Sequence, residues 1–168
     1  MRKLLTLVLL LTLWACQAES ENPLKKISLL SPKGELIKTT LVYTEKESMQ
    51  GLSGVKPEDF AHDQGMLFFY LSDEDRHFWM PDTYFDLDLF YLDHELRILD
   101  IVRKLPHYIG RSNPQLIPLA RTVWSRHVLE MKASSPIAQK LQVGDQLKWK
   151  SILDLKMTEE KIKAELKK

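Results

Sequence analysis

The stretch DLDLFYLDHELRILDIVRKL, residues 86–105, decides the fold of this chain. It contains two runs rich in β-branched and aromatic residues, and Asp93, His94 and Glu95 between them have the polarity and size of a tight connection. This pattern is typical of two antiparallel strands joined by a short turn. The stretch therefore predicts a β-hairpin in the middle of the chain.

The segments on both sides of this hairpin also have the character of strands. Residues 26–44 predict an opening hairpin with a turn at 31–34, and residues 66–71 (MLFFYL) are apolar on both faces, as expected of a central strand. Further strands are expected at 76–80, 122–133 and 145–149. So many short strands predict a mainly β domain, a compact antiparallel sheet of barrel-like shape with small helical insertions.

The expected helices are short or peripheral. Thr44 is followed three residues later by Glu47, a capping pair that predicts a helix over 45–50. A second short helix is expected around Pro136, and a charged amphipathic helix is expected from Thr158. Because the apolar stripe of the last helix is sparse, we expect it to lie outside the core.

The N-terminus has the layout of a secretory signal. Arg2 and Lys3 precede an apolar run over 4–14, which is too short to cross about 30 Å of hydrocarbon comfortably, since that takes roughly 20 residues of helix. A buried core helix is the alternative, but the run has no polar face and follows a basic pair. We therefore expect residues 1–15 to be a signal peptide that is removed.

Residues 13–16, LWAC, resemble the bacterial lipobox, whose cysteine receives a diacylglycerol thioether before cleavage. Cys16 is the only cysteine in the chain, so it has no disulfide partner within one molecule, and a free exported thiol is the remaining alternative. The resemblance implies an acylated Cys16 that binds membrane lipid. Gln17 resembles the residue found in lipoproteins sent onward to the outer membrane, so we expect anchoring on the periplasmic side of the cell envelope.

Charge and length indicate one nearly neutral domain. The chain has 24 Lys and Arg residues against 23 Asp and Glu, so loss of Arg2 and Lys3 leaves a net charge of −1. With no basic stripe, nucleic acid is not an expected partner. We expect a monomer with a tether over 16–25, a single domain over 26–154 and a helical tail over 155–168.

Several short motifs in a fixed order resemble a known family. They are GL at 51–52, GMLF at 65–68, FWMPDT at 78–83, LD at 87–88, Pro106, HVLE at 127–130 and VGD at 143–145. Together they resemble the family called domain of unknown function 192. The resemblance implies a β-barrel-like fold and no established activity. Asp82 stands where the family often has asparagine, and Ser53 stands where it often has methionine.

The densest group of chemically useful side chains surrounds Trp79. Three carboxylates, Asp82, Asp86 and Asp88, follow this ring within ten residues. An aromatic face beside carboxylates and hydroxyls suits recognition of a carbohydrate or another small ligand. The alternative is structural, with the aromatic residues in the core and the aspartates capping turns.

A second hypothesis concerns paired carboxylates. Asp88 and Glu130 both border strongly apolar strands, where an unpaired carboxyl would have a raised pKa, and two such acids could cleave a sugar or another envelope polymer. The alternative is again structural. The long proline-rich segment 106–120 could cover a cleft. The candidate ligand-binding residues are Trp79, Asp82, Thr83, Asp88, His107 and Glu130.

Other chemistry has little support in the sequence. The five histidines fall at no metal-ligand spacing, and no serine lies in a G-x-S-x-G elbow, so no metal, cofactor or catalytic residue is expected. The sequence favours a non-catalytic ligand-binding or accessory module of the cell envelope. A hydrolase that uses a carboxylate pair is the alternative, and a structural partner of another envelope protein is a third possibility.

Overall fold

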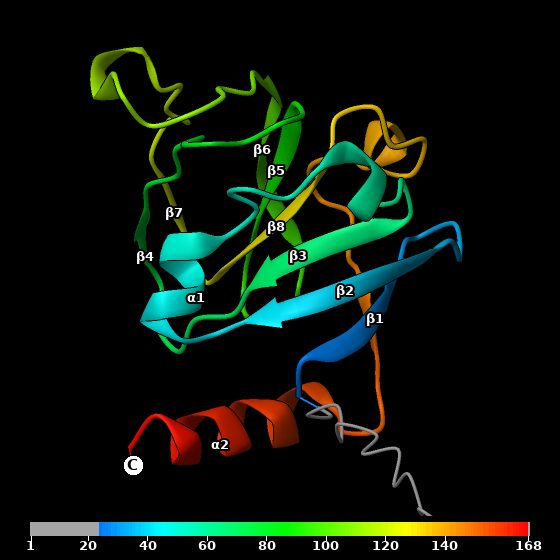
Figure 1. The fold of residues 1–168 in the computed structure, drawn as a ribbon. Coiled ribbons are helices and arrows are strands. Elements are labelled where there is room, and N and C mark those ends of the chain that lie inside the picture. The colour runs from blue at the N-terminus through cyan, green and yellow to red at the C-terminus, as the bar shows by residue number, and fades with distance from the viewer. Residues whose placement is uncertain (1–23, 168) are drawn as a thin grey trace, which may run out of the picture.

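Seven strands form one strongly curled sheet, and two short strands pair beside it (Figure 1). The computed structural model describes residues 24–167, so the expected signal peptide and Cys16 lie outside the described residues. The curled sheet has the order β6-β5-β8-β3-β2-β1-β9, and the small sheet pairs β4 with β7. The strands are β1 Lys26–Leu30, β2 Leu36–Val42, β3 Gln64–Phe68, β4 Glu74–Arg76, β5 Leu87–Leu92, β6 Ile98–Leu105, β7 Val123–Ser125, β8 His127–Lys132 and β9 Lys148–Lys150. The predicted mainly β fold is confirmed.

The segment that precedes β9 brings the two edges of the curled sheet together. The Ile98 N–H in β6 donates to the Asp145 carbonyl at 2.8 Å, and the Leu147 N–H donates to the Leu96 carbonyl at 3.0 Å. The chain then continues into β9, which pairs with β1 at the other edge. The sheet is therefore nearly closed, which confirms the expected barrel-like shape.

One strand pair differs from the expected antiparallel arrangement. β2 and β3 run parallel, with Thr40 opposite Met66. A parallel pair needs a crossover between its strands, and here the crossover contains α1 and a short 3-10 helix. The helices are α1 Glu45–Gln50 and α2 Leu155–Glu165, with 3-10 turns η1 Pro57–Asp59, η2 Pro114–Leu116 and η3 Ala138–Lys140. The predicted capping pair at the start of α1 is confirmed, because the Glu47 N–H donates to the Thr44 hydroxyl at 3.3 Å.

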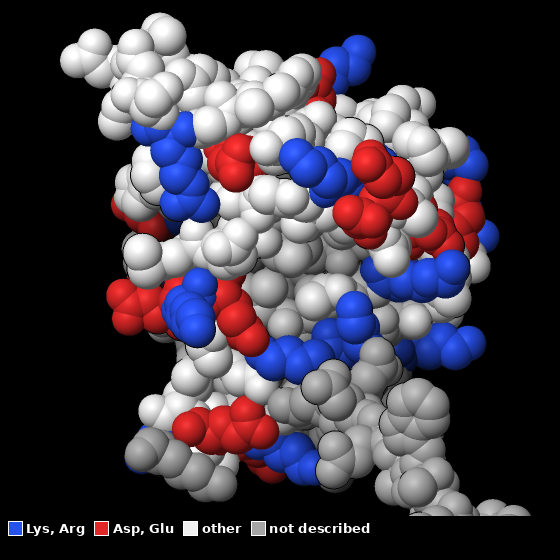
Figure 2. Space-filling model, in the orientation of Figure 1, with Lys and Arg blue, Asp and Glu red and all other residues white. Residues whose placement is uncertain are grey.

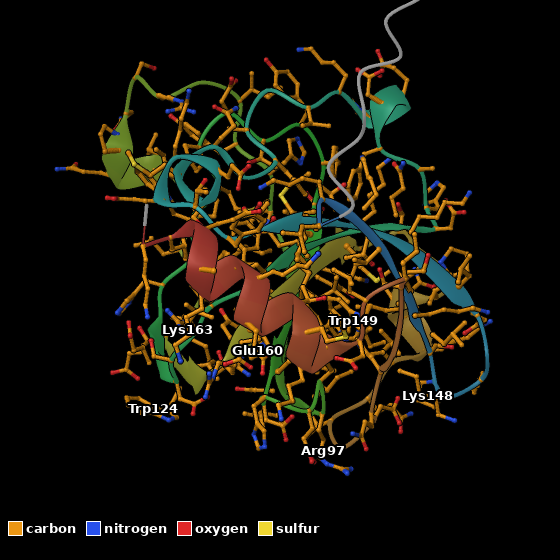
Figure 3. All side chains as sticks on the ribbon, turned by 90° about the horizontal axis from the view of Figure 1, so that it is seen from below. Arg97, Trp124, Lys148, Trp149, Glu160 and Lys163 are labelled. Carbon is orange, nitrogen blue, oxygen red and sulfur yellow. The ribbon has the colours of Figure 1, made fainter. Side chains whose placement is uncertain are left out.

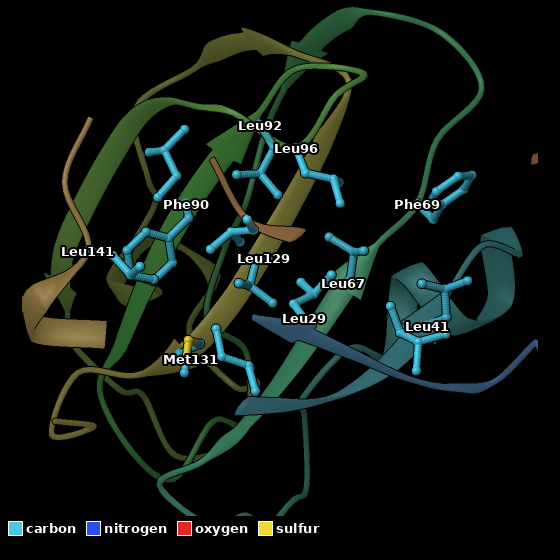
Figure 4. Close-up of a cluster of buried hydrophobic side chains, with 14 of the residues drawn as sticks. Leu29, Leu41, Leu67, Phe69, Phe90, Leu92, Leu96, Leu129, Met131 and Leu141 are labelled. Atoms are coloured by element: carbon cyan, nitrogen blue, oxygen red, sulfur yellow. The ribbon is translucent and has the colours of Figure 1, made fainter. Parts of the chain in front are cut away.

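The curled sheet is apolar on both faces. Every residue of β5 is buried, because alternate side chains enter an inner cluster inside the curl and an outer cluster on the opposite face. Figure 4 shows the inner cluster, which includes Leu29, Leu67, Phe90, Leu129 and Met131. The outer cluster includes Phe68, Phe78, Met80, Leu89, Tyr91 and Val128. The outer cluster carries the candidate site, because α1 and the segment after β4 pack over it.

The C-terminal helix α2 packs more deeply than its sequence predicts. It starts before Thr158, because the Asp154 carboxylate caps it by accepting a hydrogen bond from the Met157 N–H at 2.7 Å. Ile162 is 0% exposed and belongs to the inner cluster, so the expectation of a peripheral helix is wrong. Figure 3 shows α2 lying across the lower end of the sheet, with Trp149 near it. No helix within residues 24–167 is long and apolar enough to cross a membrane.

Two expected elements are shorter than predicted. Of the strand expected over 76–80, only Arg76 belongs to a regular strand, β4, and Trp79 makes a single isolated bridge to Leu119. The strand expected over 122–133 is divided into β7 and β8 at Arg126, whose guanidinium turns to bond the Leu71 carbonyl at 2.6 Å. The first interruption precedes the segment 77–83, which lines the candidate site.

Candidate ligand-binding pocket

A pocket of about 240 Å³ lies on the outer face of the curled sheet. Its walls are α1, the loop 51–53 and the segment 77–83, and its floor comes from β3, β5 and β8. In Figure 1 this is the region around α1 and the chain that follows β4. The polar residues that line it are Glu45, Ser48, Gln50, Ser53, Tyr70, His77, Thr83 and Glu130.

The FWMPDT segment forms one wall of the pocket, and backbone hydrogen bonds to the proline-rich loop fix its position. The Met80 N–H donates to the Pro118 carbonyl at 3.1 Å, and the Thr83 N–H donates to the Tyr108 carbonyl at 2.9 Å. The two segments therefore meet as the sequence predicts. None of residues 106–120, however, is among those that line the pocket, so the loop supports the wall and does not cover the pocket.

The opposite wall was not anticipated from the sequence. The Ser53 hydroxyl donates to the Pro81 carbonyl at 2.5 Å, and the Gly54 N–H donates to the Asp82 carbonyl at 2.8 Å. These bonds connect the loop after α1 to the FWMPDT segment. The Gly-Leu pair at 51–52 was the only signal for this wall, and it carried no indication of where the loop would dock.

Neighbouring residues of the FWMPDT segment have opposite environments. Phe78 and Met80 are 8% and 1% exposed, and the ring of Phe78 meets Phe68 edge-on with centroids 4.8 Å apart. Trp79 between them is 52% exposed. The structural alternative therefore holds for Phe78 and Met80, whereas Trp79 leaves much of its indole free at the rim of the pocket.

Glu130 is the buried acid on the floor of the pocket. It lies opposite Leu89 on β5 and Met66 on β3, which places it on the outer face, and it is 4% exposed. Burial raises the pKa of its carboxyl to about 8, and no group among residues 24–167 forms a hydrogen bond with that carboxyl. At neutral pH Glu130 is therefore largely protonated and can donate a hydrogen bond to a ligand.

Two phenols border this carboxyl. Burial raises the pKa of Tyr70 and raises that of Tyr91 to about 12, and the charge of Glu130 adds to both effects. Tyr70 lines the pocket, forms a hydrogen bond with Ser48 and has the Arg76 guanidinium 3.6 Å from its ring centroid. Both phenols stay neutral and can act only as hydrogen-bond donors or acceptors.

Asp88 lies on the other side of the sheet. It pairs with Met131 and so points to the inner face, where the Arg103 Nη1 donates to its Oδ2 at 2.5 Å. The Lys104 N–H donates to its Oδ1 at 2.8 Å, and Lys104 has a φ of 50° at the irregularity between β5 and β6. Asp88 thus stabilises an irregular strand pairing, and the structure does not bring it together with Glu130.

The other candidates divide between the pocket and its surroundings. Thr83 is buried and lines the pocket. Asp82 has a φ of 51° and accepts a hydrogen bond from the Gly110 N–H at 3.2 Å, which explains why a residue tolerant of the left-handed region stands there. His107 is exposed, with its Nδ1 2.6 Å from Asp86, beside a separate depression. Three of the six candidates therefore line one pocket, namely Trp79, Thr83 and Glu130.

Charged residues of both signs are mixed on the surface of the domain (Figure 2). Lys and Arg side chains are interspersed with Asp and Glu over the face shown in Figure 2. An open depression of about 580 Å³ over β1 and β2 is lined by Lys26, Lys38 and Lys150, and Lys38 is paired with Asp63 at 2.7 Å. Within residues 24–167, no three His, Cys, Asp or Glu side chains gather as metal ligands would.

The comparisons with known proteins identify a family and a fold. The model of the DUF192 family, described as "Uncharacterized ACR", matches residues 29–149. A solved protein from Sinorhizobium meliloti, for which a role as a transcription regulator has been suggested, is 23% identical with a TM-score of 0.56, over 74% of this chain and 92% of that one. A protein of unknown function from Novosphingobium aromaticivorans is 20% identical with a TM-score of 0.58, over 74% and 84%.

At such low identity these two structures show the fold alone. Among curated proteins there is no significant match. The matched range contains β1 from Leu29, the whole pocket and β9 up to Trp149, so the candidate site is part of the family domain. This chain belongs to the DUF192 family, a family of uncharacterised proteins.

Proposed function

We propose that this protein is a non-catalytic ligand-binding module of the cell envelope, and that its ligand occupies the pocket between α1 and the FWMPDT segment. The observation that carries the proposal is Glu130, a buried residue on the floor of the pocket whose carboxyl has no hydrogen-bond partner within residues 24–167. A ligand that offers a hydrogen-bond partner to this carboxyl gains about 0.5–1.5 kcal/mol from a neutral bond, and more where a charged group takes part.

Trp79 supplies the second element of recognition. Its half-exposed indole lies at the rim of the pocket, and an indole of this kind offers an apolar face and one N–H donor. A small ring with polar substituents, such as a sugar, fits a pocket with an aromatic rim and with Thr83, Ser48 and Glu130 inside it.

The acid pair predicted from the sequence, Asp88 with Glu130, is not assembled, and this favours binding over hydrolysis. Glycoside hydrolases place two carboxyl groups about 5–10 Å apart around the scissile bond. The pair considered from the sequence, Asp88 and Glu130, lies on opposite faces of β5 and β8, and Asp88 is already bonded to Arg103. We therefore assign Glu130 to ligand recognition.

Binding is tested on the chain from Gln17 onward, which contains every described residue. A panel of glycans and small molecules is screened by thermal shift and by Trp fluorescence. We expect a ligand whose binding is lost in Trp79→Ala and kept in Trp124→Ala, because Trp124 is 63% exposed on β7 and does not line the pocket. Equal binding by both variants, or turnover of the ligand by the unmodified protein, would contradict the proposal.

The envelope location is a separate part of the proposal. It rests on the basic pair, the apolar run and the LWAC motif at 13–16. Two or three acyl chains on Cys16 would hold the protein stably on a membrane, because each buried methylene contributes about 0.8 kcal/mol. Cys16→Ser should move the protein to the soluble fraction. An intact mass of the membrane form equal to that of the unmodified full-length chain would refute lipidation.

A further inference from the structure

The charged groups that line the pocket are all acidic, apart from one imidazole. Glu45 and Glu130 line it, His77 lies at its edge, and no Lys or Arg is among its lining residues. The Arg76 guanidinium lies over the ring of Tyr70, which lines the pocket, and its Nε donates to the Ser125 carbonyl at 3.3 Å. Within residues 24–167, no Lys or Arg forms an ion pair with Glu130.

Aromatic rings surround the same space. Phe68, Tyr70, Phe78 and Trp79 all line the pocket. The face of an aromatic ring carries partial negative charge, which attracts ammonium groups by about 0.5–2 kcal/mol. A buried acid without a counter-ion, combined with several aromatic rings, is a better match for a cation than for an uncharged ring.

We propose that the pocket binds a ligand with a primary ammonium group, which forms an ion pair with the Glu130 carboxylate among these aromatic residues. This inference rests on the proposed function and names the ligand class of the same site. Without the ligand, Glu130 keeps its proton, because an uncompensated buried charge is costly. When R–NH3⁺ enters, the Glu130 carboxyl releases that proton to the buffer and R–NH3⁺ pairs with the carboxylate that remains.

The titratable groups around Glu130 limit where a proton released at pH 7 can come from. Tyr70 on β3 and Tyr91 on β5 have raised pKa values and stay neutral at pH 7. Glu45 on α1 is exposed, and His77 is exposed with its Nδ1 2.9 Å from the Thr122 hydroxyl. A His77→Gln variant therefore serves as the control for a proton that comes from the rim imidazole.

The test is isothermal titration calorimetry on the chain from Gln17 onward, at pH 7, in two buffers with different ionisation enthalpies. The probes are matched pairs that differ in an amine or a hydroxyl: ethanolamine with ethylene glycol, cadaverine with pentanediol, and glucosamine with glucose. We expect at least one amine to bind at least tenfold more tightly than its hydroxyl partner. Its binding should release about 0.9 proton, the fraction that Glu130 carries at pH 7 when its pKa is about 8.

The variants decide whether Glu130 is responsible. Glu130→Gln should weaken amine binding at least tenfold and abolish the proton release. In His77→Gln, which also alters the rim of the pocket, the number of protons released per bound amine should stay the same even if the affinity changes. Equal affinity for amines and hydroxyl partners, binding without proton release, or failure of every amine would overturn the proposal. The proposed function fails only if the wider panel also yields no ligand that depends on Trp79, so the two results can be distinguished.

Discussion

Replacing Glu130 by glutamine should stabilise the protein at alkaline pH and leave its stability nearly unchanged at acid pH. Glutamine has the size and polarity of the protonated acid but cannot ionise. Burial raises the pKa of the Glu130 carboxyl to about 8 in the folded protein, from 4.5 in an unperturbed glutamate. Between these two values the folded state therefore binds more protons than the unfolded state.

The sign and size of the effect follow from proton linkage. Because the folded state binds the extra proton, the free energy of unfolding falls as pH rises, by about 1.4 kcal/mol per pH unit within this window. The contribution of the Glu130 proton to the free energy of unfolding is fully present below pH 4.5 and is lost as pH rises toward about 8. Across the window the loss approaches about 5 kcal/mol, and water entering the pocket would reduce it.

The assay is urea unfolding of the chain from Gln17 onward, followed by circular dichroism at several pH values from 4.5 to 9. The quantity of interest is the difference in unfolding free energy between Glu130→Gln and the unmodified protein, since other titrating groups cancel in it. Glu45→Gln, at an exposed acid of the same pocket, is the matched control and should show no such trend. A difference that stays constant with pH for Glu130→Gln would refute the argument that this carboxyl is buried and uncompensated.

Three further predictions concern the fold around the pocket. Ile162→Ala should lower the free energy of unfolding, measured in urea, by about 2–5 kcal/mol. Lys163→Ala, on the exposed face of α2, is the control and should change it by less than about 0.5 kcal/mol. Equal effects would show that α2 does not pack on the inner cluster. Asp88→Asn should lower it by about 1–3 kcal/mol, because Arg103 loses its carboxylate partner, and an unchanged melting temperature would contradict that role. Burial lowers the pKa of His127 to about 3, so its contribution to stability is present above pH ~6.5 and is lost as pH falls. His127→Gln should therefore reduce the fall in unfolding free energy at acid pH. An unaltered dependence of the unfolding free energy on pH would contradict this assignment.

The signals that define most helices and strands of this fold are local, so the sequence predicts many of these elements. The hairpin over 86–105 is visible because β-rich runs flank three polar residues, and β5 and β6 occur there. The start of α1 is visible because Thr44 and Glu47 satisfy each other's backbone N–H groups, an interaction that needs no other part of the chain. Membership of the DUF192 family follows from motifs whose order is also local information.

The environment of each side chain depended on tertiary structure. The sequence left open whether Trp79 belongs to the core or to a binding surface, because Phe78, Trp79 and Met80 are all apolar and the segment has no regular strand pattern. Hydrogen bonds to the proline-rich loop fix the segment so that Phe78 and Met80 face the sheet and Trp79 stays half exposed. For the same reason the sequence did not predict the packing of Ile162, because a sparse apolar stripe does not show whether the helix packs against the inner cluster.

By itself, the sequence determined most of the strands, the capped helix, the family and the order in which candidate residues occur. Only the tertiary structure decided which of them meet. Asp88 and Glu130 look equivalent in the sequence, but in the pairing of β5 with β8 adjacent positions point to opposite faces, so one acid meets Arg103 and the other enters the pocket. The parallel crossover between β2 and β3 then places α1 over Glu130, and no local pattern encodes that long-range contact.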